Sequence, residues 1–257
     1  MVPGLVSVSF RKLSPKDIFQ LCEECDLKCI EWGGDIHAPA GDMHKAKEIL
    51  AMSEASGIYT ASYGSYFRLG SSDDEFKRNL DTAYELKAPV LRIWAGTEGS
   101  ELCGEKKRDE WITQLERISS YAEKAGVIVA PEFHINTLTD SLVSLRYLLS
   151  ALPTQQFYWQ PRWDWSEEDR LTALKEIGSR LTYIHVFTWR IVNGTEIRLP
   201  LAQGEGMWKK VFASLDKDMP ALMEFVQNDD PENLIRDAAV LHSWIADGIL
   251  DEHNCAV

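Results

Sequence analysis

The sequence has little of what marks several large classes of protein. It holds five cysteines in 257 residues, an odd number that does not suggest a disulfide framework. No apolar run approaches the length of a membrane span, and the amino terminus lacks the basic and long apolar segments of a signal peptide. We therefore expect a cytoplasmic protein with no membrane partner.

An excess of basic residues is also missing. The chain has 27 Lys and Arg against 40 Asp and Glu, a formal net charge of -13. Nucleic-acid partners favour clustered Lys and Arg, so we expect no nucleic-acid partner and a small-molecule substrate instead. The hydrophobic fraction of 45% and the charged fraction of 26% are those of an ordinary globular protein.

Apolar segments of strand length alternate with amphipathic segments of helix length along the whole chain. The strands are expected at 5–10, 28–32, 58–63, 89–95, 127–132, 156–160, 181–187 and 221–226, and the helices at 15–25, 43–56, 73–87, 106–124, 139–150, 167–177, 206–215 and 231–247. Eight such units with short linkers predict one α/β domain over residues 1–257, a single (β/α)8 TIM barrel. The main alternative is an open doubly wound sheet, but no Gly-rich phosphate fingerprint follows the first strand.

One strand stands out because it ends in charged residues. Segment 127–134, VIVAPEFH, begins with four apolar residues without polar alternation, which indicates a strand buried on both faces. It closes on Glu132 and His134. A buried glutamate needs a partner, so Glu132 is expected to meet a metal ion, a substrate hydroxyl or a basic residue on a neighbouring strand.

Other expected strands also end in polar side chains, and the active site of a (β/α)8 barrel lies at these carboxyl ends. These side chains are Glu31, His37, Arg92, Trp94, Gln160, Trp163, His185, Trp189, Arg190 and Glu224. Two glutamates, one amide and one histidine come from four successive strands: Glu132, Gln160, His185 and Glu224. Carboxylate oxygen and neutral imidazole together suit a divalent ion. In the alternative interpretation, His185 is a core histidine and Glu224 pairs with Arg92.

Several segments resemble those of the xylose isomerase-like TIM barrels, the sugar phosphate isomerase/epimerase family. They are PEFH around Glu132, YIHVFTW around His185 and MEFV around Glu224, with EWGGDIHAPAGD and LPLAQGEGMWKKVF in addition. The resemblance covers nearly the whole chain. It implies that a Glu, an Asp, a His and a second Glu hold one divalent ion, and that the two glutamates act as acid and base on an α-hydroxy carbonyl substrate.

The sequence departs from the family pattern at one ligand. Gln160 occupies the position that matches the family's metal-binding Asp, and Trp163 lies near the place of a family His. A Gln side chain can still offer its carbonyl oxygen, but without charge. Metal affinity should therefore be lower, and the bound ion should be more electrophilic.

The residues and the resemblance together predict a divalent-metal-dependent sugar isomerase or epimerase, which transfers a proton next to the carbonyl of a keto- or aldo-sugar. Glu132 and Glu224 are the expected catalytic residues, and Mn²⁺ is the first expectation, with Mg²⁺, Co²⁺ or Zn²⁺ as alternatives. The side chains expected to contact the carbohydrate are His37, Trp94, His134, Trp163, Trp189 and Arg190. Alternative functions are a metal-dependent lyase or hydrolase acting on keto-sugar glycosides, and a non-catalytic sugar-binding barrel. Because such barrels often pair, a homodimer is also expected.

Two other interpretations of the sequence, a cysteine metal site and a nuclease, are less well supported. Cys22, Cys25 and Cys29 have no matched fourth ligand nearby, so buried thiols are a better interpretation than a zinc or iron–sulfur site. The same superfamily contains apurinic endonucleases, which need more metal ligands than this sequence offers and a basic face for DNA.

Overall fold

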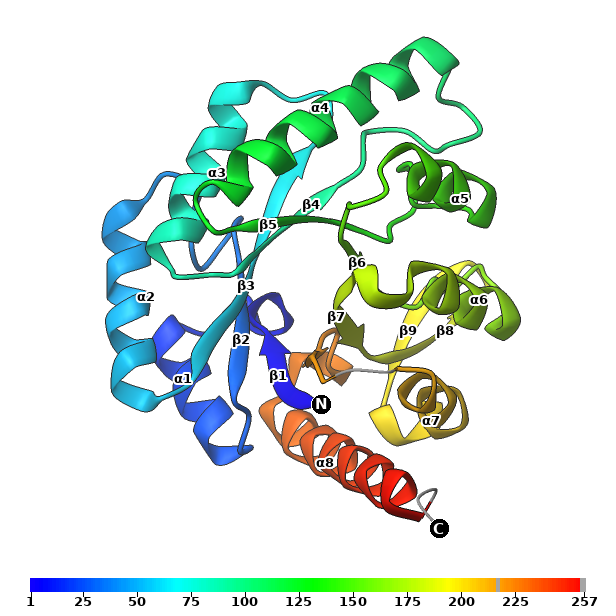
Figure 1. Cartoon of the computed structure of the whole chain (residues 1–257). Helices are drawn as coiled ribbons and strands as arrows, with labels where there is room; N and C mark the ends of the chain where they lie inside the picture. The colour runs from blue at the N-terminus through cyan, green and yellow to red at the C-terminus, as the bar shows by residue number, and fades with distance from the viewer. Residues whose placement is uncertain (216–217, 255–257) are drawn as a thin grey trace.

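The computed structural model describes residues 1–215 and 218–254. Parallel strands close into a barrel in the order β1-β10-β7-β6-β5-β4-β3-β2, and Figure 1 shows the helices arranged around it. The barrel strands are β1 (Val2–Val6), β2 (Cys29–Gly33), β3 (Tyr59–Arg68), β4 (Val90–Trp94), β5 (Ile128–Glu132), β6 (Phe157–Trp159), β7 (Leu181–Val186) and β10 (Pro220–Met223). The predicted (β/α)8 barrel is confirmed, and the open sheet is excluded.

Apart from the end of the last helix, the helices begin and end close to the positions expected from caps and apolar periodicity. They are α1 (Pro15–Glu24), α2 (Met43–Ser56), α3 (Asp73–Glu85), α4 (Glu105–Glu123), α5 (Leu142–Ala151), α6 (Glu167–Ile177), α7 (Glu205–Ala213) and α8 (Pro231–Asn254), with 3-10 turns η1 (Ser7–Phe10), η2 (Gly178–Arg180), η3 (Leu201–Gly204) and η4 (Gln227–Asp229). Ser14 and Asp17 form a capping box at α1, and Ser166 caps α6. Among the described helices, none is long and apolar enough to cross a membrane.

The interior of the barrel is apolar toward the amino ends of the strands and charged toward their carboxyl ends. Successive side chains of a strand point to opposite faces, so residues two apart share a face. Cys29, Val90, Ala130 and Leu222 belong to one buried apolar cluster. Each lies two residues before a buried charged side chain: Glu31, Arg92, Glu132 and Glu224. The apolar layer thus supports a layer of charges nearer the carboxyl ends of the strands.

The structure corrects several expected bounds. The strand expected at 221–226 ends at Met223, and the helix expected at 231–247 continues to Asn254. The strand expected at 5–10 ends at Val6, and residues 7–10 form η1. The Ser7 hydroxyl there accepts a hydrogen bond from the Gly33 amide at 2.9 Å, which turns the chain toward the loop after β2. The strand expected at 58–63 continues to Arg68.

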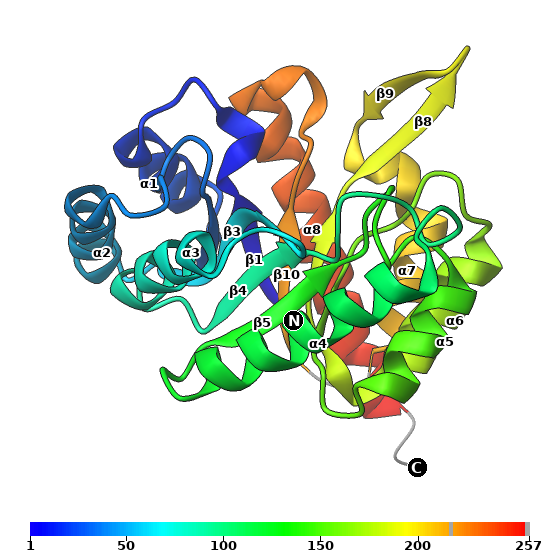
Figure 2. The same ribbon diagram turned by 90° about the horizontal axis from the view of Figure 1, so that it is seen from above.

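An antiparallel hairpin was not expected at all. It consists of β8 (Thr188–Val192) and β9 (Thr195–Leu199), and it rises from the end of the barrel where α8 begins (Figure 2). Asn193 and Gly194 form its turn with φ of 51° and 75°. Positive φ at both central residues is what an Asn-Gly hairpin turn requires. The Asn-Gly pair between two short β-prone runs was therefore the signal that could have predicted it.

Candidate metal centre at the mouth of the barrel

Three of the four predicted ligands meet at the carboxyl ends of the strands. Nδ1 of His185 lies 3.1 Å from Oε1 of Glu132 and 3.2 Å from Oε2 of Glu224. One ligand atom from each residue can be chosen so that all lie within 4.8 Å of one another. All three side chains are buried. Strands β5, β7 and β10 thus bring together residues that are far apart in the sequence.

One polar atom in each of three predicted ligands lacks a hydrogen bond. Nδ1 of His185, Oε2 of Glu224 and Oε1 of Gln160 are buried without a hydrogen bond of acceptable geometry. The Gln160 amide nitrogen donates to the Phe133 carbonyl at 2.8 Å, which leaves its carbonyl oxygen as the group in need of a partner. Buried polar atoms are costly unless satisfied. Oxygen and imidazole donors that lack partners fit a divalent cation. Gln160 as the fourth ligand remains a prediction.

Arg92 occupies the same layer of the barrel. Its Nε lies 2.9 Å from Oε1 of Glu31, and its Nη1 donates to Oε2 of Glu132. Glu132 therefore does pair with a basic residue of a neighbouring strand, which was one of the expected alternatives. The alternative pair of Arg92 with Glu224 is not formed among the described contacts. In the sequence, Arg92 was considered only as a partner of Glu224, and Glu31 only as a strand-end polar residue without a role.

Glu31 holds the other side of the histidine. Its Oε2 accepts a hydrogen bond from the Ser62 hydroxyl at 2.7 Å and lies 3.4 Å from Nε2 of His185. The Tyr158 ring packs against His185, with centroids 4.6 Å apart. The imidazole is thus fixed by carboxylates at both nitrogens and by an aromatic ring. Its Nδ1 faces the other two glutamates as a consequence.

The cluster holds the carboxylates of Glu132 and Glu31 ionised. Burial by itself would raise the pKa of Glu132, but the charges of Arg92 and His185 outweigh it and lower the pKa to about 2. The same balance, with Arg92 and His185 as the main opposing groups, holds the pKa of Glu31 well below its usual range. Burial would lower the pKa of His185, whereas the surrounding carboxylates, Glu224 first, raise it well above its usual value. The single charge of Arg92 therefore does not balance the two ionised carboxylates of Glu31 and Glu132.

Two of the predicted substrate-binding residues lie beside the cluster. The indole Nε1 of Trp94 donates to Oε2 of Glu132 at 2.6 Å, and the His134 ring packs on Trp94 at 4.9 Å. Tyr66 and Arg68 also contact the Trp94 ring. The sequence interpretation missed both because it ended their strand at Tyr63, before the alternation in SYGSYFR was complete.

The predicted aromatic and basic residues after β7 separate onto two faces of the hairpin. Trp189 stacks on Phe225, the residue after Glu224, with centroids 5.1 Å apart. Arg190 follows Trp189 in β8 and so points to the opposite face. Arg198 pairs across the strands with Trp189 and shares its face. Trp189 therefore packs on the residue that follows Glu224, whereas the Arg190 side chain leaves from the other face of β8.

The remaining two predicted contacts are placed less favourably for substrate. His37 is buried, with Nδ1 2.9 Å from the Ser7 hydroxyl and Nε2 3.2 Å from the Leu13 carbonyl. A substrate contact through either ring nitrogen would need to break one of these bonds. Trp163 is 43% exposed, and among the described contacts none joins its ring to the charged cluster.

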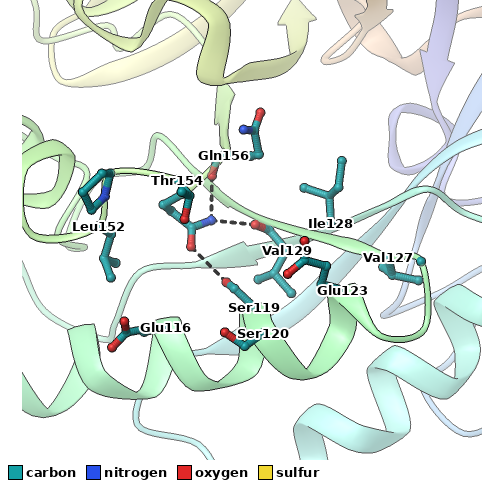
Figure 3. Close-up of a pocket in the computed structure, with 13 residues that line it drawn as sticks. Glu116, Ser119, Ser120, Glu123, Val127, Ile128, Val129, Leu152, Thr154 and Gln156 are labelled. Carbon is teal, nitrogen blue, oxygen red and sulfur yellow. Dashed lines mark hydrogen bonds between the residues drawn. The ribbon is translucent and has the colours of Figure 1, made fainter.

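A cavity of about 600 Å³ lies elsewhere, between α4, the start of β5 and the segment before β6. Figure 3 shows Ser119 and Ser120 of α4 and Ile128 of β5 along it. The Gln155 amide at its edge already bonds the Ser119 hydroxyl and the Val129 carbonyl. Because this cavity borders the amino-terminal end of β5, it is separate from the charged cluster at the carboxyl ends.

The fold and the cluster define a closed (β/α)8 barrel with a candidate metal centre at its carboxyl-terminal mouth. The chain belongs to the xylose isomerase-like TIM barrels, whose family model matches residues 19–243. A comparison with curated protein sequences finds no significant match.

Solved structures share the fold at low identity. A probable 3-DHS dehydratase, AsbF, from Bacillus anthracis is 21% identical with a TM-score of 0.78, over 94% of this chain and 99% of that one. A xylose isomerase domain protein from Planctomyces limnophilus is 15% identical with a TM-score of 0.75, over 99% of each chain. An L-ribulose 3-epimerase is 12% identical with a TM-score of 0.74, over 100% of this chain and 99% of that one. The neighbours thus include both an epimerase and a dehydratase.

Proposed function

We propose that the protein is a divalent-metal-dependent enzyme that transfers a proton next to the carbonyl of a sugar, as an isomerase or epimerase. The observation that carries the proposal is the convergence of Glu132, His185 and Glu224 within 4.8 Å at the barrel mouth. These residues, with Gln160, would hold the ion, Mn²⁺ being our first choice because oxygen ligands predominate. When bound, the ion supplies a positive charge that stabilises the oxyanion formed as the proton leaves.

The two glutamates are suited to different parts of this reaction. One oxygen of Glu132 accepts hydrogen bonds from Arg92 and Trp94, so this carboxylate is fixed and stays ionised. Oε2 of Glu224 is buried without a hydrogen bond. A general base must reach the proton that it removes and then hand it on. We therefore assign proton removal to Glu224, whose Oε2 is free to accept the proton, and orientation of the substrate to Glu132, because a carboxylate with a lowered pKa is a weak base.

A lyase is the second candidate, and His134 is the observation that favours it. Its Nδ1 is 2.8 Å from the Ile135 carbonyl, its ring lies beside Trp94, and no described residue bonds its Nε2. Elimination of a hydroxyl group needs a base for the C–H proton and an acid for the leaving oxygen, and His134 offers a ring nitrogen for the second role. A dehydratase among the structural neighbours agrees with this chemistry.

Both candidates are tested by incubating the Mn²⁺-loaded protein in D₂O with keto- and aldo-sugars and sugar acids, followed by NMR and mass spectrometry. An isomerase or epimerase incorporates deuterium at the carbon next to the carbonyl and keeps the elemental composition. A lyase gives a product that has lost water. We expect E132Q and E224Q to abolish both signals. If the wild-type protein does not bind Mn²⁺ saturably, the proposal of a metal-dependent enzyme is wrong, and the non-catalytic sugar-binding barrel becomes the preferred function.

A further inference from the structure

Arg68 lies at the mouth of the barrel. It ends β3 beyond a register shift between Gly64 and Arg68, and it contacts Trp94, whose indole bonds Glu132 at the barrel mouth. Its side chain is half-buried. Its guanidinium lies 3.9 Å above the centroid of the Trp94 ring. The cation is therefore held in place by stacking rather than by an opposite charge.

The guanidinium of Arg68 is short of partners. It donates one hydrogen bond, at 3.2 Å, to the Gly96 carbonyl, and no carboxylate oxygen of the described residues lies within 4.0 Å of it. Two other arginines at this end of the barrel are paired with carboxylates: Arg11 with Asp35 and Arg162 with Asp164, each at 2.6 Å. An arginine has five N–H donors in a planar fork that matches a carboxylate or a phosphate. Most of the donors of Arg68 remain available to a ligand.

The position of Arg68 relative to the candidate catalytic residues is also informative. One indole ring separates it from Glu132, because Trp94 stacks under the guanidinium and donates its Nε1 hydrogen to Glu132. The His134 ring packs on the same indole. A substrate whose reacting carbons lie near Glu132 and Glu224 would extend along Trp94 toward Arg68.

Charge counting in this layer leaves Arg68 in excess. The buried groups that contact one another around His185 are three carboxylates, Glu31, Glu132 and Glu224, and one guanidinium, Arg92. A divalent ion with a neutral histidine would balance them. The charge of Arg68 then has no counterpart among these groups. A ligand with one negative charge would supply it.

We propose that Arg68 binds an anionic group of the substrate, a carboxylate or a phosphate, so that the enzyme acts on a sugar acid or a sugar phosphate rather than on a neutral sugar. This assignment rests on the proposed function, because it places the anion in the site of that reaction. Arg68 is then a specificity-determining residue, which contacts the substrate away from the reacting carbons. Stacking on Trp94 fixes its planar fork before the substrate arrives.

Calorimetric titration of the Mn²⁺-loaded protein with sodium acetate and with sodium phosphate, at constant ionic strength set by chloride, tests the proposal. We expect saturable binding of at least one anion by the wild type. In R68Q the affinity for that anion should fall at least about tenfold, because the charged guanidinium that donates the hydrogen bonds is removed. Acetate binding indicates a carboxylate, and phosphate binding indicates a phosphorylated substrate. The control is R180Q. Arg180 directly precedes β7, at the opposite end of the barrel, and it donates hydrogen bonds to the backbone carbonyls of Leu149, Leu152 and Pro153. The R180Q variant should therefore bind anions as the wild type does.

Circular dichroism and thermal melting establish that both variants are folded before titration. Three results would overturn the proposal. They are binding of neither anion by the wild type, a less than tenfold loss of anion affinity in R68Q, and an equal loss of anion affinity in R180Q. The proposed function is tested separately by Mn²⁺ binding and deuterium incorporation. Saturable Mn²⁺ binding without anion binding would therefore contradict the proposed anion site but not the proposed metal-dependent enzyme.

Discussion

Nε of Arg92 lies 2.9 Å from Oε1 of Glu31, and neither side chain is appreciably exposed to solvent. The guanidinium also bonds Glu132, so a single cation joins carboxylates from β2 and β5 through β4. A buried ion pair adds little net stability compared with apolar residues of the same shape, but loss of one partner leaves an uncompensated buried charge. Arg92 therefore determines whether Glu31 and Glu132 can both remain ionised in this layer.

The first prediction is that R92M strongly destabilises the protein. Two buried carboxylates lose their cation, so we expect a loss of about 3–5 kcal/mol in the free energy of unfolding, measured by urea denaturation. The control is R146M, which breaks the exposed pair of Arg146 and Glu176 and should change little. Equal effects of the two substitutions would show that burial of the Arg92 pair is unimportant.

The second prediction concerns Gly64, which faces the same pair. A Cβ at this position would lie 2.5 Å from Oε1 of Glu31 and 2.8 Å from Nη2 of Arg92. Both distances are too short, and the rigid ion pair cannot move without losing hydrogen bonds. G64A should therefore lower the free energy of unfolding by about 1–3 kcal/mol, as overpacked core substitutions do.

Gly206 in α7 provides the matched control for Gly64. A Cβ at this position meets nothing within 4 Å, so G206A should stabilise the helix by about 0.5–1 kcal/mol. The comparison uses the same chemical change at both sites. Destabilisation of similar size in the two variants would indicate that the close contacts at Gly64 relax without cost.

The third prediction concerns the charge of the metal site. Q160D adds a carboxylate where the side-chain oxygen lacks a hydrogen bond, so Mn²⁺ affinity in calorimetry should rise by about tenfold or more. E224Q removes a ligand charge and a proton carrier, so affinity should fall and turnover should be abolished. If Q160D leaves affinity unchanged while E224Q still binds Mn²⁺ fully, these residues do not form one site.

The fourth prediction concerns the cysteines near α1. Burial raises the pKa of Cys25 to about 11 and that of Cys29 to about 12, and it raises the pKa of Cys22 well above its usual value. Only the thiolate reacts, and a raised pKa leaves the thiol neutral at pH 8. Iodoacetamide at pH 8 should therefore label these residues at least about tenfold more slowly in the native protein than in urea.

Peptide mapping by mass spectrometry resolves each of these cysteines. Labelling of the native protein should increase as the pH is raised from 8 toward 10, because the thiolate fraction grows as the pH approaches the pKa. Rapid labelling of Cys29 at pH 8 would contradict its burial. Co-purification of zinc that protects all three residues would revive the metal interpretation of this segment.

The local pattern of the sequence was sufficient for the elements. Ser166 before EEDRLTALKEI gives the cap and span of α6, and Ser14 with Pro15 gives the start of α1, because capping and apolar periodicity act within a few residues. The apolar run that ends at Glu132 correctly gave a buried strand with a charge at its end. Eight repeats of this alternation were enough to specify a closed barrel.

The pattern was insufficient where a contact depends on neighbours in space. The Asn-Gly turn of the hairpin was available in the sequence, but the two short strands beside it were assigned to a loop. The partner of Glu132 could not be chosen in advance between a metal ion and a basic residue. The structure shows that Arg92 and the ligand cluster contact different oxygens of the same carboxylate.

Which charged side chains meet was decided by strand order and register alone. Glu31 and His185 are 154 residues apart in the chain, and they approach each other only because the barrel closes and both strands point them inward. Likewise, Arg68 reaches the mouth because β3 continues five residues past Tyr63, an extension that depends on pairing with β4 at Trp94. Local propensity determines where a strand or helix forms, whereas closure of the sheet determines which buried charges must neutralise one another.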